Sequence, residues 1–148
     1  MSYYPPTGFY FKVQIAGASS EDDAAFTEVS GLDMEIEVEE IKEGGENGFT
    51  HRLPGRVKYS NLVLKRGILV KGSQFAQWCQ STLRTGPGGR LTCKDLDVFL
   101  LDENGNPLLT WSCSRAWPVK WSVGAFDSTR NEVAVETLEF AYRQLKRR

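Results

Sequence analysis

The chain has 148 residues, of which 41% are hydrophobic and 25% charged, and its formal net charge at pH 7 is -1. These values predict a single globular domain over residues 1–148 that folds without disulfides or a structural metal. The charge balance, with one short basic cluster at residues 143–148 that we interpret as a solvated tail, argues against nucleic-acid binding. No run approaches the about 20 apolar residues of a membrane-spanning helix, so no membrane insertion is expected.

Two further features of composition concern the site of synthesis. Cys79, Cys93 and Cys113 are odd in number and widely spaced, which favours a reducing compartment and three thiols in the core. The N-terminal residues lack a cationic start followed by a long apolar run. We therefore expect synthesis in the cytoplasm without a signal peptide.

The first half of the chain is predicted to form strands. Residues 9–15 alternate apolar and polar side chains, as a half-buried strand does, and residues 26–29 indicate a second, short strand. In residues 32–39 the period of two places Leu32, Met34, Ile36 and Val38 on one face and the acidic residues on the other. The apolar face is expected to pack on the domain body. Glu35, Glu37 and Glu39 form a row that needs water or countercharge.

A polar, glycine-rich arm over residues 42–56 follows this acidic strand, and residues 57–69 are expected to return beside residues 32–41 as the second strand of a long hairpin. The arm is too long and too polar for an internal turn, since loops of that length in compact domains are usually functional. We expect it to contact a partner. The candidate contact residues are Glu43, Glu46, Phe49, His51, Arg52, Leu53 and Arg56.

The second half predicts one helix and three more strands. Ser73 is a candidate N-cap for a helix over about residues 73–84, which the glycine-rich residues 85–89 end. Residues 91–102 and 108–114 flank Asn104-Gly105, a hairpin signal. Pro118 predicts an extended turn, and the last strand is expected over residues 132–142. The sum is a mainly β fold with one flanking helix.

The search for a catalytic, cofactor or metal site gives nothing specific. His51 has no nucleophile or carboxylate at a recognised spacing, so a hydrolase built on it is a weak alternative. The glutamate row lacks further metal ligands, and residues 44–48 lack the lysine and serine of a phosphate loop. Trp111, Trp117 and Trp121 share strand parity and leave open a small-ligand β-barrel. No catalytic residue, cofactor or metal is predicted.

Several ordered blocks carry a resemblance that runs from about residue 4 to residue 142. They are residues 9–13, 26–32, the glutamate-rich strand, 43–47, 53–55, 64–67 and 116–121. Together they resemble the tail tube proteins of contractile phages and, more closely, those of phage-tail-like extracellular contractile injection systems. The resemblance implies two packed antiparallel sheets in a barrel-like sandwich with one flanking helix, related in fold to the type VI secretion tube protein.

The resemblance also implies hexameric rings that stack into a hollow tube inside a contractile sheath, within a phage tail or an extracellular particle. The chain would then be the repeated tube subunit or the first ring on the baseplate. Its partners would be copies of itself, sheath and baseplate proteins, neighbouring tube proteins and possible protein cargo in the lumen. In such a ring, Glu35, Glu37 and Glu39 are expected to face the lumen, and the arm is expected to contact the next ring.

Overall fold

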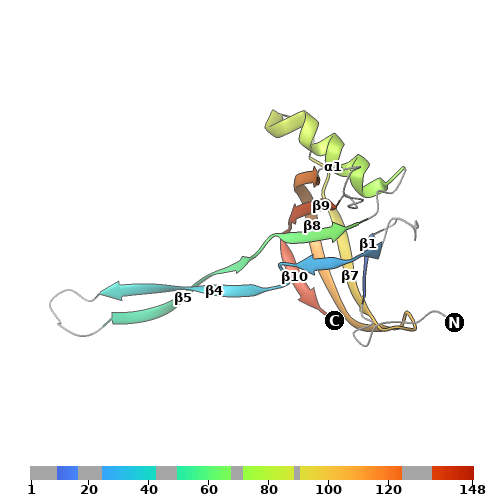
Figure 1. Ribbon diagram of the computed structural model, residues 1–148. Coiled ribbons are helices and arrows are strands. Elements are labelled where there is room, and N and C mark those ends of the chain that lie inside the picture. The colour runs from blue at the N-terminus through green and yellow to red at the C-terminus, as the bar shows by residue number, and fades with distance from the viewer. Residues whose placement is uncertain (1–9, 17–24, 43–49, 68–71, 89–90, 125–134) are drawn as a thin grey trace.

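The computed structural model describes residues 10–16, 25–42, 50–67, 72–88, 91–124 and 135–148, and Figure 1 shows their arrangement. Antiparallel strands dominate, one α-helix flanks them, and one long hairpin projects from the body. The mainly β fold class is therefore confirmed. The elements are β1 (Tyr10–Ile15), β2 (Ala25–Phe26), β3 (Glu28–Ser30), β4 (Met34–Lys42), β5 (Thr50–Tyr59), β6 (Leu62–Arg66), α1 (Gln74–Thr85), the 3₁₀ turn η1 (Gly86–Gly88), β7 (Lys94–Leu101), β8 (Pro107–Val123), β9 (Glu136–Ala141) and β10 (Gln144–Arg147).

The larger sheet bends round into a barrel-like body. Its strand order is β2-β1-β7-β8-β9-β6-β3, with β10 paired to β8 outside this path. The two end strands, β2 and β3, are separated in sequence by Thr27 alone, whose backbone N–H donates to the carbonyl oxygen of Lys65 on β6 over 2.9 Å. The sheet thus returns to its own start, which leaves few unprotected edges.

Strand β8 makes the turn between the two halves of the body. Its first half pairs with β7 and β10, and its second half pairs with β9. Between the halves Arg115 has φ 50° in a β-bulge, and its backbone N–H donates to Asp95 Oδ1 over 2.9 Å. A bulge bends a strand and increases its twist, so one 17-residue strand serves both halves.

The core lies inside the barrel and beneath α1. Ser73 caps the helix as predicted, accepting a hydrogen bond from the Ala76 backbone N–H at 3.0 Å, and the helix spans Gln74–Thr85. Its apolar side packs on the sheet, with the Trp78 ring stacked on Phe140 at 5.2 Å between centroids. The hydrophobic core cluster consists of Val13, Ile15, Phe26, Leu62, Leu64, Phe75, Trp78, Cys79, Leu96, Val98, Cys113, Ala116, Leu138, Phe140 and Leu145.

Three expectations about the second half are wrong. Pro118 makes no turn: it is buried within β8, next to a second bulge, where a missing N–H is tolerated. The basic C-terminus is no free tail, because Gln144–Arg147 forms β10 with Leu145 buried. Cys93 is exposed, whereas Cys79 and Cys113 lie in the core. The alternation of side chains along a strand does not show where the strand has a bulge. The position of an isolated cysteine in the sequence does not show whether its side chain is buried.

Candidate assembly surface

The hairpin of β4 and β5 projects from the barrel as a separate two-stranded sheet (Figure 1). Its base is held by Tyr142, whose hydroxyl donates to the Gly31 carbonyl oxygen at 3.2 Å and whose ring lies 5.6 Å from that of Tyr59. Gly31 has φ +89°, and a Cβ there would lie 1.9 Å from the Asn61 carbonyl oxygen, so only glycine fits. The direction of the hairpin is thus set by packed residues at its base.

The hairpin begins its return earlier than the sequence predicts. Strand β5 starts at Thr50 and pairs Thr50 with Lys42, whereas the sequence places the start of the return strand at residue 57. A bulge places Gly55 and Arg56 opposite Glu37, and a Cβ on Gly55 would meet the Glu37 carbonyl oxygen at 3.0 Å. Residues 50–56 of the arm are therefore strand and not loop. Proline and glycine in the segment obscured it, because both are depleted in strands.

One face of the hairpin is apolar and exposed. Residues directly opposite each other on β4 and β5 have side chains on the same face of the hairpin. Val57 lies opposite Ile36 and Pro54 lies opposite Val38, so all four side chains are on the same face as Met34. The exposed fractions are 54% for Met34, 56% for Ile36, 52% for Val38 and 48% for Val57. The expectation that this face packs on the domain body is wrong beyond Leu32, which does pack against the core. Contiguous apolar surface of this kind marks an interaction site.

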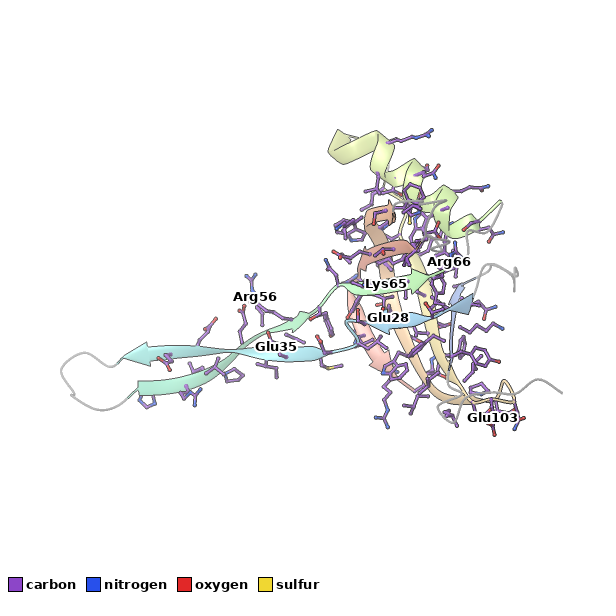
Figure 2. All side chains as sticks on the ribbon, in the orientation of Figure 1. Glu28, Glu35, Arg56, Lys65, Arg66 and Glu103 are labelled. Atoms are coloured by element: carbon purple, nitrogen blue, oxygen red, sulfur yellow. The ribbon has the colours of Figure 1, made fainter. Side chains whose placement is uncertain are left out.

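The other face carries the predicted acidic row. Glu35 and Glu39 are exposed, Glu37 is half-buried, and Figure 2 shows Glu35 on the projecting hairpin. Lys58, opposite Glu35, forms an ion pair with Glu37 at 2.5 Å. The hydrogen bond that Lys58 donates to Glu37, together with the negative charge of that carboxylate, raises the pKa of Lys58. Because water still reaches both side chains, which are 59% exposed for Lys58 and 38% exposed for Glu37, the pair adds little stability.

The predicted arm residues lie on or beyond β5. His51, Arg52, Leu53 and Arg56 are on this strand, and Figure 2 shows Arg56 extending from the hairpin. Arg52 lies opposite Glu40, on the apolar face, and Leu53 lies opposite Glu39, on the acidic face. Glu43, Glu46 and Phe49 lie outside the described residues. The structure thus brings one apolar strip, one acidic row and several bases together on a single projecting element.

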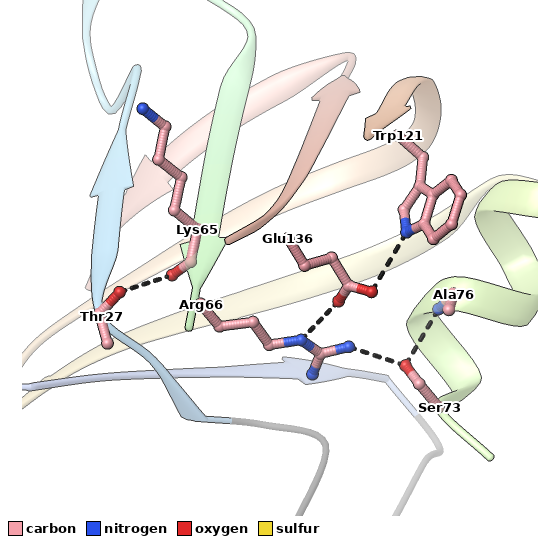
Figure 3. Close-up of polar contacts among 7 residues, drawn as sticks. All are labelled: Thr27, Lys65, Arg66, Ser73, Ala76, Trp121 and Glu136. Carbon is pink, nitrogen blue, oxygen red and sulfur yellow. Dashed lines mark hydrogen bonds and ion pairs between the residues drawn. The ribbon is translucent and has the colours of Figure 1, made fainter. Parts of the chain in front are cut away.

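A buried polar cluster, drawn in Figure 3, was missed by the sequence analysis. Arg66 Nε donates to Glu136 Oε1 at 2.6 Å, and Arg66 Nη2 donates to the Ser73 hydroxyl at 2.9 Å. Trp121 Nε1 donates to Glu136 Oε2 at 3.3 Å. The cluster ties β6, β8 and β9 to the start of α1. The sequence does contain a signal for this cluster, because both charged residues occupy core-facing positions in alternating strands. Arg66 continues the alternation of Leu62 and Leu64, and Glu136 begins the alternation of Leu138 and Phe140.

The three tryptophans do not form one surface. Trp111 lies opposite the buried Val98 and Trp121 opposite the buried Leu138, so both face the core. Trp117 lies opposite Ala141 and faces the other side, because the bulge after Pro118 shifts the parity. Over the described ranges no group of three histidine, cysteine, aspartate or glutamate side chains could hold a metal ion. Nor is α1 long and apolar enough to cross a membrane.

Comparison with known families accounts for this architecture. The family described as T4-like virus tail tube protein gp19 matches residues 7–146. The chain belongs to this family. It is a tail tube protein, and the family is one of structural tube subunits, as the resemblance implied. No curated protein matches the sequence significantly.

Several solved structures share the fold of this tail tube protein. A chain in the cryo-EM structure of the anti-feeding prophage baseplate, 6-fold symmetrised, is 29% identical with a TM-score of 0.75, covering 100% of this chain and 97% of that one. A chain in the PVC sheath-tube complex of an extracellular contractile injection system, in the extended state, is 24% identical with a TM-score of 0.72, covering 99% and 91%. Hcp1 from Flavobacterium johnsoniae is 14% identical with a TM-score of 0.55, covering 93% and 94%.

Proposed function

We propose that this tail tube protein forms hexameric rings that stack into a hollow tube of a contractile injection apparatus, with a structural and not a catalytic role. The observation that carries the proposal is the projecting hairpin, whose apolar face is about half exposed in the single chain. Its partners are further copies of itself, a sheath, baseplate proteins and neighbouring tube proteins. Its position is the repeated tube subunit or the first ring on the baseplate.

The apolar face of the hairpin covers a neighbouring copy in this proposal. Covering a half-exposed aliphatic side chain contributes about 1 kcal/mol, so Met34, Ile36, Val38 and Val57 together supply several kcal/mol per contact. In a closed head-to-tail ring, the apolar face of every copy packs on one neighbour, and every copy is contacted by the apolar face of its other neighbour. The exposed apolar surface of the single chain is thereby removed.

The acidic row faces the water-filled lumen. Glu35, Glu37 and Glu39 lie on the hairpin face opposite the apolar strip, so a neighbour that covers the strip leaves the carboxylates solvated. Like charges in a row are tolerated where water reaches them. Protein cargo then passes charged, hydrated groups in place of adhesive apolar surface.

The distal part of the hairpin, residues 42–56, contacts the next ring. Among the described residues, the end of β4 and the start of β5 lie farthest from the barrel body (Figure 1), and β5 carries the exposed side chains of His51, Arg52 and Leu53. Leu53 is 45% exposed, which suits docking into a neighbour. Glu43, Glu46, Phe49 and Arg56 are assigned to the same contact.

Ring formation is tested by sizing coupled to light scattering and by negative-stain microscopy. The purified protein is expected to give closed rings. Ile36→Ser is expected to reduce ring formation, whereas Glu35→Ser, one position away on the opposite face, leaves it intact. Monomer mass over a wide concentration range, without rings even on a cognate baseplate, would refute the proposal.

The lumen assignment is tested by replacing Glu35, Glu37 and Glu39 together with glutamine. Rings are expected to form normally, because exposed carboxylates contribute little to a contact, and the set of cargo proteins retained in the tube is expected to change. Loss of rings in this variant would show that the acidic face is itself a subunit contact.

Stacking is tested by shortening the hairpin. Lys42 and Thr50 are paired in the ladder, so an Asn-Gly turn can replace residues 43–49 without altering either strand. The variant is expected to keep its cooperative melt and its rings while losing tube growth. An insertion of two further residues in the same turn is the matched control for the new connection. Tubes of normal length from the shortened variant would show that residues 43–49 are not needed for the contact between rings.

A further inference from the structure

The turn between β7 and β8 carries two groups that can react with each other. Asn104 is exposed to water at the tip of this hairpin and is followed by Gly105. Figure 2 shows the neighbouring Glu103 at the end of the barrel away from α1. Gly105 has φ +83°, a left-handed conformation that favours glycine. The turn therefore requires a residue without a Cβ, and such a residue leaves its backbone nitrogen open to the side-chain amide before it.

The reaction open to this pair is deamidation of Asn104, with water as the co-reactant. The Gly105 backbone nitrogen loses its proton to hydroxide and forms a bond to Asn104 Cγ, and the bond from Cγ to the amide nitrogen breaks to release ammonia. Water then opens the resulting cyclic imide at either carbonyl. The product is aspartate, or isoaspartate whose main chain runs through Cγ. Hydrolysis alone balances the reaction, so no oxidant or reductant is needed.

Hydrogen bonds to Asp102 oppose this reaction in the folded chain. The Gly105 backbone N–H donates to the Asp102 carbonyl oxygen at 3.0 Å. Asp102 Oδ1 accepts hydrogen bonds from the backbone N–H groups of Asn104 and Asn106, each at 2.9 Å. These carboxylate bonds hold the main chain in the turn. The Gly105 nitrogen must leave its own hydrogen bond to attack Asn104 Cγ, so the turn has to open before the reacting atoms meet.

We propose that Asn104 is a site of spontaneous deamidation and that the Asp102 carboxylate slows the reaction in the folded protein. Asp102 is a positioning residue, because its carboxylate acts by holding the turn closed. Asn106 lies in the same turn but cannot react in this way, since the nitrogen of Pro107 carries no hydrogen. Reactants and restraint belong to one chain, so this proposal stands or fails separately from the proposed ring.

The modification would change the charge and the length of the turn. Either product adds a carboxylate beside Asp102 and Glu103, and like charges this close repel one another. Isoaspartate also adds a methylene group to the main chain between Asn104 and Gly105. This insertion displaces the Gly105 N–H from the Asp102 carbonyl oxygen and loosens the hairpin that joins β7 to β8.

The first test compares the folded chain with the same chain unfolded in guanidinium chloride, both incubated at pH 8. Peptide mass mapping with fragmentation distinguishes Asn104 from Asn106 and from Asn47, which also precedes a glycine. Asn104 is expected to deamidate at least about tenfold faster in the unfolded chain, and Asn106 is expected to stay unmodified. No product at Asn104 in the unfolded chain would overturn the site. Equal rates in the two states would overturn the protection.

The second test removes the carboxylate from the folded protein. Asp102→Ala is expected to speed deamidation of Asn104 by about tenfold, which corresponds to about 1.4 kcal/mol, close to the lower end for a hydrogen bond to a charged acceptor. Asp102→Asn keeps an acceptor oxygen and is expected to react at nearly the unmodified rate. Glu103→Ala, which removes an adjacent exposed carboxylate, is the matched control and is expected to have no effect.

Two outcomes of the second test would overturn the role of Asp102. One is an unchanged rate in an Asp102→Ala variant that still melts cooperatively. The other is an equal acceleration in Asp102→Asn or Glu103→Ala, which would show that negative charge near the turn, and not hydrogen bonding, slows the reaction. If Asp102→Ala does not melt cooperatively, the comparison of the folded and unfolded unmodified chain still decides the proposal.

Discussion

Replacing Glu136 with glutamine tests the buried ion pair at the junction of barrel and helix. The Arg66 and Glu136 side chains are only 3% and 4% exposed, and their atoms Nε and Oε1 lie 2.6 Å apart. Removing one charge leaves the guanidinium buried without its countercharge. Breaking such a pair costs about 3–5 kcal/mol. For a chain of this size, that lowers the melting temperature by about 6–20 °C.

The neighbouring exposed pair supplies the control for this experiment. Lys65 precedes Arg66 on β6 and lies on the other face of that strand. Its Nζ is 4.0 Å from Glu28 Oε2, and the side chains of Lys65 and Glu28 are 41% and 62% exposed. Glu28→Gln is expected to cost at most about 1 kcal/mol. Thermal melts and denaturant titrations measure both variants. If Glu136→Gln loses no more than Glu28→Gln, water screens the inner pair and the reasoning from burial is refuted.

A double substitution separates charge from packing. Arg66→Met with Glu136→Leu removes both charges and is expected to be close to neutral or stabilising, since apolar residues of similar volume often replace a buried pair without loss. Ser73 would then lose a hydrogen-bond donor but keep its capping bond to Ala76. A loss as large as that of the single variant would show that the hydrogen bonds, and not the charge, hold the junction.

The remaining predictions concern the thiols and the hairpin base. Burial, with a smaller effect from Asp97, raises the pKa of Cys113 to about 12, so a maleimide at pH 8 is expected to label Cys93 and leave Cys113 unmodified. The Cys113 thiol keeps its proton to a higher pH in the folded protein than in the unfolded chain. Its contribution to the free energy of unfolding is therefore complete below about pH 9 and is lost as pH rises towards 12. A free energy of unfolding, measured by denaturant titration, that stays constant from pH 9 to pH 12 would contradict this. Gly31→Ala is expected to cost about 3 kcal/mol or more, read from the melt, because of its positive φ and the blocked Cβ position. Tyr142→Phe is expected to cost about 1 kcal/mol through the lost hydrogen bond to Gly31, and an unchanged melt would show that the ring contact alone holds the base.

Local patterns in the sequence determined much of this structure. Alternation of side chains identified the two faces of β4, and Ser73 with the apolar spacing after it located α1 to within one residue. Asn104-Gly105 marked the hairpin between β7 and β8, where Gly105 has φ +83°. These features depend on neighbours a few residues apart, so the linear sequence contains the physical reason for each.

Tertiary structure decided which surfaces those faces meet. The alternating Met34, Ile36 and Val38 have the sequence pattern of a strand that packs on the core. In the structure these side chains are about half exposed, because Gly31 and Tyr142 direct the hairpin away from the barrel. The pairing of Arg66 with Glu136 joins residues 70 positions apart. Bulges in β5 and β8 shift parity where the ladder bends. Such outcomes depend on contacts between distant segments, which periodicity along a single strand does not encode.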